Sequence, residues 1–596
     1  MLNEPKSQSL NDRHLGAIFF RRVEELGDRP FVKLQRGKRF EEISWRDFGA
    51  KVSKAILALY FLGLTKGDRV AIIGENSLPW LCADLATLAG GLPNVIASPS
   101  LSDTTLLKML RHSRCRAAFV ENETTVGRLL NLKGQLPALQ HIIVMVGTGS
   151  EVPSALTFEE LLARGSGDTS ARLSKVLQSI HAEDLASIMY TSGSTGEPKG
   201  VMRTQGNLLA NISNGGEIAL SKPEELAVIV LSLNHLLGRF GFLKSAVTGR
   251  TTAVIEATEQ AAELKVIAAL LPTVMTIVPR VMAMMWNTIL DEGTNRAQWE
   301  ELEQLEKERA EKGRLSGEEA GRYEQLKIAL KEAVQHALGG RIKYISYGGA
   351  PMAPRIMHFF RLIDIPLLGT YGTTECGGVS LSGLGEAKPG SLGKPFPNVQ
   401  VRIADDGEIM VRGPTVTPGY FENPEATREA IDDDGWFHSG DLGRIDSDGC
   451  LYVIGRKKDV FYCSDGSNVY PGYIELLLEN DPFVRQAILL GDRRPFMAAL
   501  VVPDRKKIAA EAKTEDSALA DEKIEAVIQS RIDQINLRLE NVEKIRKIVL
   551  MPDDFPAAVR SVTVFQKIRI DRKAVEERYQ KEISAIYPPI SERGAA

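Results

Sequence analysis

Short apolar runs alternate with longer amphipathic segments along most of this chain. Val70–Ile73 and Ala117–Val120 are continuous apolar runs, which are typical of strands buried on both faces. Segments with helical spacing, such as 45–62 and Leu78–Ala89, lie between runs of this kind. The pattern continues with apolar runs at 185–189, 227–231 and 274–278 and with further strand-like segments at 141–145 and 342–346. This alternation predicts an α/β fold with parallel sheets covered on both faces.

Two stretches depart from this pattern. The segment at about 295–337 is rich in Glu, Lys, Arg, Leu and Ala and is broken by glycines at 313–317, which predicts a charged helical hairpin. Because charges of both signs alternate in it, we expect a solvated excursion rather than a nucleic-acid arm. At about 395–455 short strands and turns follow one another, which predicts a small β subdomain.

The chain is long enough for more than one domain, because single cores seldom grow beyond about 300 residues. A polar, charged tetrad at 456–459 separates one apolar strand from the next apolar run. We therefore place a boundary there, with a large N-terminal domain at 1–457 and a small α+β C-terminal domain at 458–596.

The most informative stretch is the loop at 191–200, directly after an apolar run. It combines three glycines, several serine and threonine hydroxyls, and Lys199. Glycines let backbone N–H groups approach an anion closely, and a lysine adds charge, so the loop is suited to phosphate. The alternative is a flexible surface turn. It is not a Walker loop, because no Gly-Lys-Ser/Thr triplet opens a helix; after it, Asn207 is expected to cap a helix running to about Gly215.

Two later segments repeat the transition from a strand to a glycine-containing turn. The first is at 348–351 and the second at 369–375. In open α/β folds such turns lie at the carboxyl ends of strands, where the backbone is exposed to a ligand.

Composition and charge narrow the class of protein. Of 596 residues, 43% are hydrophobic and 25% charged, and the formal net charge is only -4, which argues against a global field for nucleic acid. The first residues carry no apolar secretory segment, and no apolar run reaches the ~18 residues that a membrane span needs. We expect a cytoplasmic protein, with peripheral membrane contact left open.

The cysteines show no spacing typical of a zinc site, and their scattered positions suit a reducing compartment. They are Cys82, Cys115, Cys376, Cys450 and Cys463.

Five motifs occur in one order along the chain, at 191–200, 371–375, 436–442, 455–459 and 468–471. This ordered set resembles the adenylate-forming superfamily, which includes acyl-CoA synthetases, luciferases and the adenylation domains of peptide synthetases. The resemblance runs from about Leu15 to Tyr579. The charged excursion and the segments 491–496 and 572–579 are most similar to bacterial long-chain fatty acyl-CoA synthetases.

The resemblance implies a reaction. In this superfamily a carboxylate attacks the α-phosphorus of ATP, pyrophosphate leaves, and a thiol then displaces AMP from the acyl-adenylate. Such chemistry depends on positioning and on electrostatic stabilisation of phosphoryl oxygens. The implied substrates are a medium- or long-chain fatty acid, ATP and coenzyme A, and the implied metal ion is Mg²⁺.

By the same resemblance, site residues are expected at several loops. Glu375 and Thr195 would hold Mg²⁺, a hard ion suited to oxygen ligands. Asp441 would accept hydrogen bonds from the ribose hydroxyls, assisted by Arg456. The phosphates would lie against Thr191, Ser192, Gly193, Ser194, Thr195, Gly196 and Lys199, and the adenine near Gly348, Gly349, Ala350, Tyr371, Gly372 and Thr374.

Three further roles follow from the resemblance. His235 would lie between the nucleotide and the acyl pocket, which is expected along 231–243 and around Gly348. Lys458 takes the position of the hinge about which the C-terminal domain rotates between the two half-reactions. Without that context, a lysine there would be a solvated linker charge and an isolated histidine would be structural.

The chain departs from the superfamily pattern near its carboxyl end. The catalytic lysine of the superfamily corresponds to Lys567 when one counts forward from Phe555, but to Arg569 when one counts backward from the segment 572–579. We favour Lys567; if Arg569 fills the position, its planar guanidinium is a poor replacement for a point-charge ammonium, and slow adenylation is expected. Gln205 also stands where relatives often carry histidine.

Three functions therefore stay open. The first is an ATP-dependent acyl-CoA ligase. The second is an acyl-AMP ligase that loads a carrier protein or activates a specialised acid without CoA. The third is a nucleotide or acyl binder that has lost turnover, which the uncertain lysine would permit. Acyl chain length and oligomeric state have no signal in the sequence.

Overall fold

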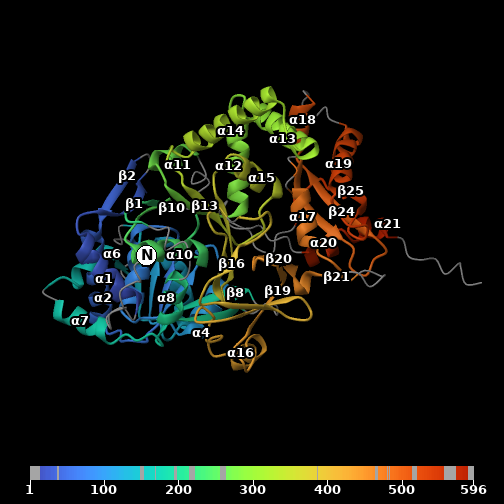
Figure 1. Ribbon diagram of the computed structural model, residues 1–596. Helices are drawn as coiled ribbons and strands as arrows, with labels where there is room; N and C mark the ends of the chain where they lie inside the picture. The colour runs from blue at the N-terminus through green and yellow to red at the C-terminus, as the bar shows by residue number, and fades with distance from the viewer. Residues whose placement is uncertain are drawn as a thin grey trace, which may run out of the picture.

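The structure is a computed structural model, and it describes most of the chain. The described residues are 14–36, 39–147, 154–167, 170–192, 198–213, 222–255, 264–385, 387–462, 468–479, 481, 483–512, 520–555 and 572–587. The blue to light-orange elements form a large N-terminal part, and the deeper orange to red elements from β21 (Phe461–Tyr462) to α21 (Gln580–Ile586) form a smaller part beside it (Figure 1).

A seven-stranded sheet carries the phosphate-type loop. Its strands are parallel except for β9, which pairs antiparallel with β8 at one edge. Their order is β7 (Leu156–Thr157), β6 (His141–Val144), β5 (Ala117–Val120), β3 (Val70–Ile73), β4 (Asn94–Ala97), β8 (Leu185–Ser192) and β9 (Pro198–Thr204).

A nine-stranded sheet forms the second layer. Its central strands are parallel, and antiparallel strands extend both ends. Their order is β16 (Lys394–Pro395), β15 (Gly377–Leu381), β14 (Leu367–Thr373), β13 (Tyr344–Tyr347), β12 (Val274–Ile277), β10 (Leu226–Ile229), β11 (Thr251–Val254), β1 (Pro30–Arg36) and β2 (Arg39–Ser44).

Helices cover both faces of the two sheets. One buried core is shared by both sheets and by α1 (Leu15–Leu26), α2 (Trp45–Phe61), α3 (Leu78–Ala89) and α10 (Leu236–Thr248). Within it the Trp45 and Phe31 rings stack at 3.8 Å between centroids. Each such side chain contributes about 1.5–3 kcal/mol when it is fully buried. Successive side chains of a strand point to opposite faces of its sheet. Ile72 therefore packs in this core, while Ala71 and Ile73 pack in the core on the other face of the seven-stranded sheet, and both faces need helices to cover them.

The outer faces carry the remaining helices of the N-terminal part. Helices α4 (Asp103–Ser113) and α5 (Glu123–Leu132) pack on the seven-stranded sheet. Helices α11 (Leu264–Leu270), α12 (Pro279–Asp291) and α15 (Pro354–Leu362) pack on the nine-stranded sheet. The other helices are α6 (Phe158–Arg164), α7 (Ser170–Gln178) and α8 (Gln205–Ser213).

The charged excursion is a pair of helices, as expected. Helix α13 (Asn295–Lys312) ends at Gly313 in the left-handed conformation, and α14 (Gly317–Ala337) begins with a capping box from Ser316 and Glu319. Trp299 of α13 is fully buried and anchors the pair to α15 through Phe359, 5.0 Å away between ring centroids. In Figure 1 the two helices lie along the upper edge of the molecule.

Smaller sheets follow the two large sheets along the chain. A four-stranded antiparallel sheet has the order β17 (Gln400–Ile403), β18 (Glu408–Arg412), β19 (Phe437–Ile445) and β20 (Leu451–Arg456), with α16 (Pro424–Ala430) beside it. Beyond it lie β21 (Phe461–Tyr462), β22 (Asn468–Val469), β23 (Val484–Leu490), β24 (Met497–Pro503) and β25 (Ile545–Leu550), with α17 (Pro471–Glu479), α18 (Arg505–Glu511), α19 (Asp521–Asn536), α20 (Arg572–Arg578) and α21 (Gln580–Ile586). The predicted α/β fold with a smaller C-terminal α+β part is confirmed.

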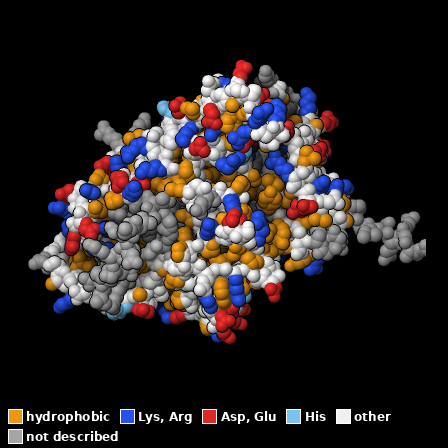
Figure 2. All heavy atoms as spheres, viewed as in Figure 1, with side chains coloured by type: hydrophobic (Ala, Val, Ile, Leu, Met, Phe, Trp, Pro, Cys, Tyr) orange, Lys and Arg blue, Asp and Glu red, His pale blue; other side chains and the backbone are white. Residues whose placement is uncertain are grey.

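The surface has a mixed character. Apolar side chains gather in the middle of the face in Figure 2, and charged side chains are frequent toward its margins. Within the described ranges, no helix combines the length and apolar character needed to cross a bilayer.

One local prediction was wrong. Helix α8 begins at Gln205, so Asn207 lies in its first turn and does not precede it. The Asn207 side chain accepts from the Thr204 backbone N–H at 3.2 Å, and the Thr204 hydroxyl accepts from the Asn207 N–H at 3.1 Å. Thr204 therefore caps the helix, and the two residues satisfy each other's exposed donors.

Candidate active site

The phosphate-type loop is the turn of a hairpin between β8 and β9. In the antiparallel register Thr191 lies directly opposite Lys199. Directly opposed residues of an antiparallel pair project to the same face of the sheet, so both side chains leave the base of the turn on one side. Several predicted phosphate ligands lie outside the described residues: Gly193, Ser194, Thr195, Gly196 and the side chain of Ser192.

Tyr420 joins Lys199 to Glu375. The Lys199 ammonium nitrogen lies 5.2 Å from the centroid of the Tyr420 ring, within the range of a cation–π contact. The Tyr420 hydroxyl donates to Glu375 Oε1 at 3.3 Å. Burial and the Glu375 carboxylate raise the pKa of Tyr420, so its hydroxyl stays protonated and continues to donate. Lys199 and Glu375, which are far apart in the sequence, thus both contact the side chain of Tyr420.

Hydrogen bonds from neighbouring segments fix the backbone of the turn that carries Glu375. The Thr373 hydroxyl accepts from the Glu375 backbone N–H at 3.2 Å, and the Glu375 carbonyl accepts from the Thr417 N–H at 2.7 Å. Arg203, a fully buried residue of β9, donates to the backbone carbonyl of Thr374. Because β9 also carries Lys199, one strand supports both sides of the site.

Asp441 lies at the centre of a second group. Its carboxylate accepts from the Tyr371 hydroxyl at 2.7 Å and pairs with Arg456 Nε at 2.7 Å. Asp441 and Arg456 are direct partners in the β19–β20 ladder, which explains their contact. Burial raises the pKa of Asp441, although Arg456 and Tyr371 oppose the shift, and the charge of Glu375 raises it further. Asp441 is thereby linked through Tyr371 to the strand that leads into the Glu375 turn.

The glycines near the expected adenine position are required for different reasons. A Cβ on Gly348 would come within 2.7 Å of Thr370 Cγ2, so this glycine permits β13 to lie against β14. Gly349 has φ +80 with open space around it, a conformation that favours glycine. A Cβ on Gly372 would come within 2.1 Å of the Gly377 carbonyl oxygen. Ala350 is half-buried beside them.

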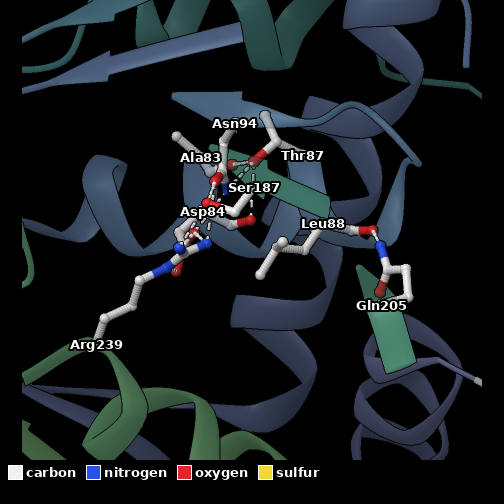
Figure 3. Close-up of polar contacts among 8 residues, drawn as sticks. All are labelled: Ala83, Asp84, Thr87, Leu88, Asn94, Ser187, Gln205 and Arg239. Atoms are coloured by element: carbon white, nitrogen blue, oxygen red, sulfur yellow. Dashed lines mark hydrogen bonds and ion pairs between the residues drawn. The ribbon is translucent and has the colours of Figure 1, made fainter. Parts of the chain in front are cut away.

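His235 and Gln205 have distinct surroundings. His235 precedes the first turn of α10, where solvent reaches its ring while the surrounding protein lowers its pKa. Gln205 is fully buried, and its amide donates to the Leu88 carbonyl at 2.8 Å (Figure 3). This contact gives Gln205 a structural role that the sequence could not indicate.

The expected hinge follows β20 directly. Lys458 lies in a short 3₁₀ turn and is exposed. Its neighbour Lys457 pairs with Asp406 at 2.6 Å and with Glu408 at 3.1 Å. Glu408 in turn accepts from the Gly440 N–H at 2.8 Å, next to Asp441. The two candidates for the catalytic lysine position, Lys567 and Arg569, lie outside the described residues.

Lys199 offers a positive charge for an anion, and Glu375 offers carboxylate oxygens for a hard metal ion. The buried Asp441 carboxylate can accept from hydroxyl donors. No cluster of three or more metal-ligating side chains occurs in the described part of the chain. Tyr420 and Arg203 were missed from the sequence. Neither lies in a glycine-rich motif, and their partners are 45 and 171 residues away, so no local pattern marked them.

Comparison with known proteins gives consistent matches. Residues 19–421 match the family model described as AMP-binding enzyme, and residues 458–590 match the AMP-binding enzyme C-terminal domain. The chain is 32% identical to a long-chain-fatty-acid–CoA ligase of Mycobacterium tuberculosis, FadD15, over 92% of each protein. It is 27% identical to the peroxisomal long chain acyl-CoA synthetase 7 of Arabidopsis thaliana, over 92% of this chain and 82% of that protein.

Among solved structures, the adenylation domain of a carboxylic acid reductase from Segniliparus rugosus, in complex with AMP and a co-purified carboxylic acid, matches with a TM-score of 0.73 at 20% identity. The match covers 98% of this chain and 95% of that one. At this identity the likeness describes the shared fold.

Proposed function

Because this chain belongs to the AMP-binding enzyme family, we propose that it activates a medium- or long-chain fatty acid with ATP and transfers the acyl group to coenzyme A. The observation that carries the proposal is that Tyr420 contacts both Lys199 and Glu375, while the Asp441 carboxylate accepts from Tyr371 on the strand that leads into the Glu375 turn. The fatty acid class follows from the relatives, whose names specify long-chain acids.

We assign the β- and γ-phosphates of ATP to the hairpin turn. Lys199 supplies the charge and Thr191 a hydroxyl, and both stand at the base of the turn. The remaining ligands would be Ser192, Gly193, Ser194, Thr195 and Gly196. The ring of Tyr420 restricts the Lys199 side chain, which reduces the entropy lost when phosphate binds.

Mg²⁺ would lie between Glu375 and the phosphates. A single carboxylate fits this ion, because Mg²⁺ in nucleotide sites is commonly bound by one or two carboxylates together with substrate phosphates. Thr195 is the expected second protein ligand. When bound, the ion neutralises charge that develops on the phosphoryl oxygens.

Asp441 and its partners suit the ribose. The carboxylate already accepts from Tyr371 and pairs with Arg456, so its orientation is set before the nucleotide arrives. A carboxylate oxygen can accept two hydroxyl donors, which matches a ribose diol. Gly348, Gly349, Ala350, Gly372 and Thr374 would border the adenine.

The acid would enter beside α10, with His235 at its nucleotide end. Its carboxylate oxygen attacks the α-phosphorus, the bond to pyrophosphate breaks, and an acyl-adenylate forms. Lys567 is our candidate for the ammonium that contacts the reacting carboxylate and α-phosphate. The thiol of CoA then attacks the acyl carbon and AMP leaves.

The two half-reactions would be separated by rotation about Lys458, which defines domains at 1–457 and 458–596. In support, the C-terminal family model starts at residue 458. Hinge motions of domains, absorbed by a few residues between elements, close many enzymes around their substrates. We propose a cytoplasmic location, and peripheral membrane contact stays open because the proposed substrate is an amphiphile.

The test is pyrophosphate release from the purified chain with a panel of carboxylic acids, each with and without CoA. We expect release with medium- or long-chain acids and a thioester product when CoA is present. Release without thioester would support a ligase that loads a carrier protein instead. Absence of release with every acid would contradict both enzymatic functions and favour a binding protein.

A further inference from the structure

A buried polar network joins helices α3 and α10 to strands β4 and β8 of the seven-stranded sheet (Figure 3). At its centre, Asp84 of α3 and Arg239 of α10 form an ion pair with 2.7 Å between Oδ1 and Nη2, and both side chains are 0% exposed. Arg239 Nη1 donates to the Ser187 hydroxyl of β8 at 2.9 Å. Arg239 Nη2 also donates to Asn94 of β4 at 3.1 Å, and Asn94 accepts from Ser187 at 2.6 Å.

Stability alone does not explain this arrangement. Removing two charges from water is costly, and well-packed apolar side chains of similar volume often stabilise a core as well or better. The ion pair fixes the relative orientation of the elements that it joins, because the planar guanidinium holds its hydrogen-bond partners at fixed angles. All three guanidinium nitrogens of Arg239 are used, toward α3, β4 and β8.

Both ends of the network lead into the active site. Ser187 lies four residues before Thr191, on the strand that enters the phosphate-type turn. Arg239 lies one helical turn after His235, and its backbone N–H donates to the His235 carbonyl at 3.1 Å. The guanidinium therefore ties the first turn of α10, beside the proposed acyl pocket, to the strand that carries the proposed phosphate site.

We propose that Arg239, held by Asp84, is a positioning residue for adenylation, which sets the first turn of α10 against β8. This proposal rests on the proposed function. Adenylation requires a carboxylate oxygen and a phosphorus atom to be held about 3–3.5 Å apart, and a misplacement of about 1 Å can lower a rate by about 100-fold. A rigid link between the two substrate sites maintains that separation.

The first test is Ser187→Ala, which removes one partner of Arg239 and leaves the buried ion pair in place. Its matched control is Ser245→Ala. Ser245 is also fully buried in this structure and accepts from a buried arginine, Arg250, at 3.1 Å, but it lies near the other end of α10. We expect Ser187→Ala to lower kcat for pyrophosphate formation about tenfold, with the KM values for ATP and fatty acid within threefold. Ser245→Ala should stay within twofold of the wild type.

The second test removes both charges at once, in Asp84→Asn combined with Arg239→Met, so that no unpaired charge is left in the core. It should show the same loss of kcat. Thermal midpoints are measured for each variant, and kinetics are taken at least 10 °C below them, so that partial unfolding does not enter. If the double variant does not fold, Ser187→Ala against Ser245→Ala decides.

A kcat within twofold of the wild type in Ser187→Ala would overturn the positioning role, whatever its thermal midpoint. So would a loss confined to the KM for ATP, or an equal loss of kcat in Ser245→Ala. A wild type that releases no pyrophosphate with any acid would instead contradict the proposed function, and the two failures are thereby distinguished.

Discussion

Replacing Glu75 with glutamine should stabilise the protein increasingly as the pH rises. Glu75 follows β3 and is half-buried, and its carboxylate accepts from the Ser232 hydroxyl at 3.3 Å. Burial, and then the charge of Glu121, raise the pKa of Glu75 from its ordinary 4.5 to about 7. The folded state therefore holds a proton on Glu75 at pH values where the unfolded chain has released it.

The sign and size follow from this difference. A raised pKa contributes stability that is complete below about pH 4.5 and is lost as the pH rises to about 7. At 1.36 kcal/mol for each pKa unit, the loss is about 3 kcal/mol. Because Glu75 is half-buried, solvent screening makes this an upper value. A glutamine amide at this position carries no charge at any pH and avoids the loss.

The assay is thermal unfolding of the wild type and Glu75→Gln in matched buffers from pH 5 to pH 8. At an unfolding entropy of about 2.1 cal/mol/K for each residue, a domain of the size of 1–457 shifts by about 1 °C per kcal/mol, so the difference between the two midpoints should grow by up to about 3 °C across this range. Glu42→Gln is the control, since Glu42 is a surface carboxylate paired with Lys33, with its side chain 51% exposed. A midpoint difference that stays constant between pH 5 and pH 8 would refute the reasoning.

Three further predictions concern the site. Asp441→Asn should weaken AMP binding about tenfold or more in calorimetry, because hydrogen bonds to charged groups contribute about 1.5–3 kcal/mol; unchanged affinity would remove Asp441 from the nucleotide site. Lys567→Ala should abolish adenylate formation, measured by pyrophosphate exchange, while Arg569→Ala keeps most of it; the reverse result would assign the position to Arg569. Lys458→Pro should slow thioester formation at least tenfold and adenylation less than about threefold, and equal losses would count against rotation at this residue.

The sheets could be predicted where strands are buried on both faces. Val70–Ile73 and Ala117–Val120 form the strands that their continuous apolar runs indicate. Strand β9 was not predicted, because Pro198 and Lys199 begin it with the composition of a turn. Its pairing with β8 is what converts the phosphate-type loop from a strand-to-helix connection into a hairpin.

Side-chain contacts between distant segments had no signal in the sequence. The motifs at 371–375 and 436–442 marked Glu375 and Asp441, but Tyr420 lies outside both, and its contact with Glu375 depends on how the chain packs. Asp84 and Arg239 are 155 residues apart, and each looks like an ordinary helix residue until α3 and α10 pack together. Local patterns thus predicted the elements and the motifs, whereas the partners that orient them come from tertiary structure.

The most direct test of the central claim follows one oxygen atom. The proposed reaction joins a carboxylate oxygen of the acid to the α-phosphorus of ATP, and that oxygen leaves with AMP when the thiol attacks. With a long-chain fatty acid labelled with ¹⁸O in its carboxyl group, CoA and ATP, mass spectrometry should find one ¹⁸O atom in each AMP formed and none in pyrophosphate. Unlabelled AMP, or label in pyrophosphate, would contradict activation through an acyl-adenylate.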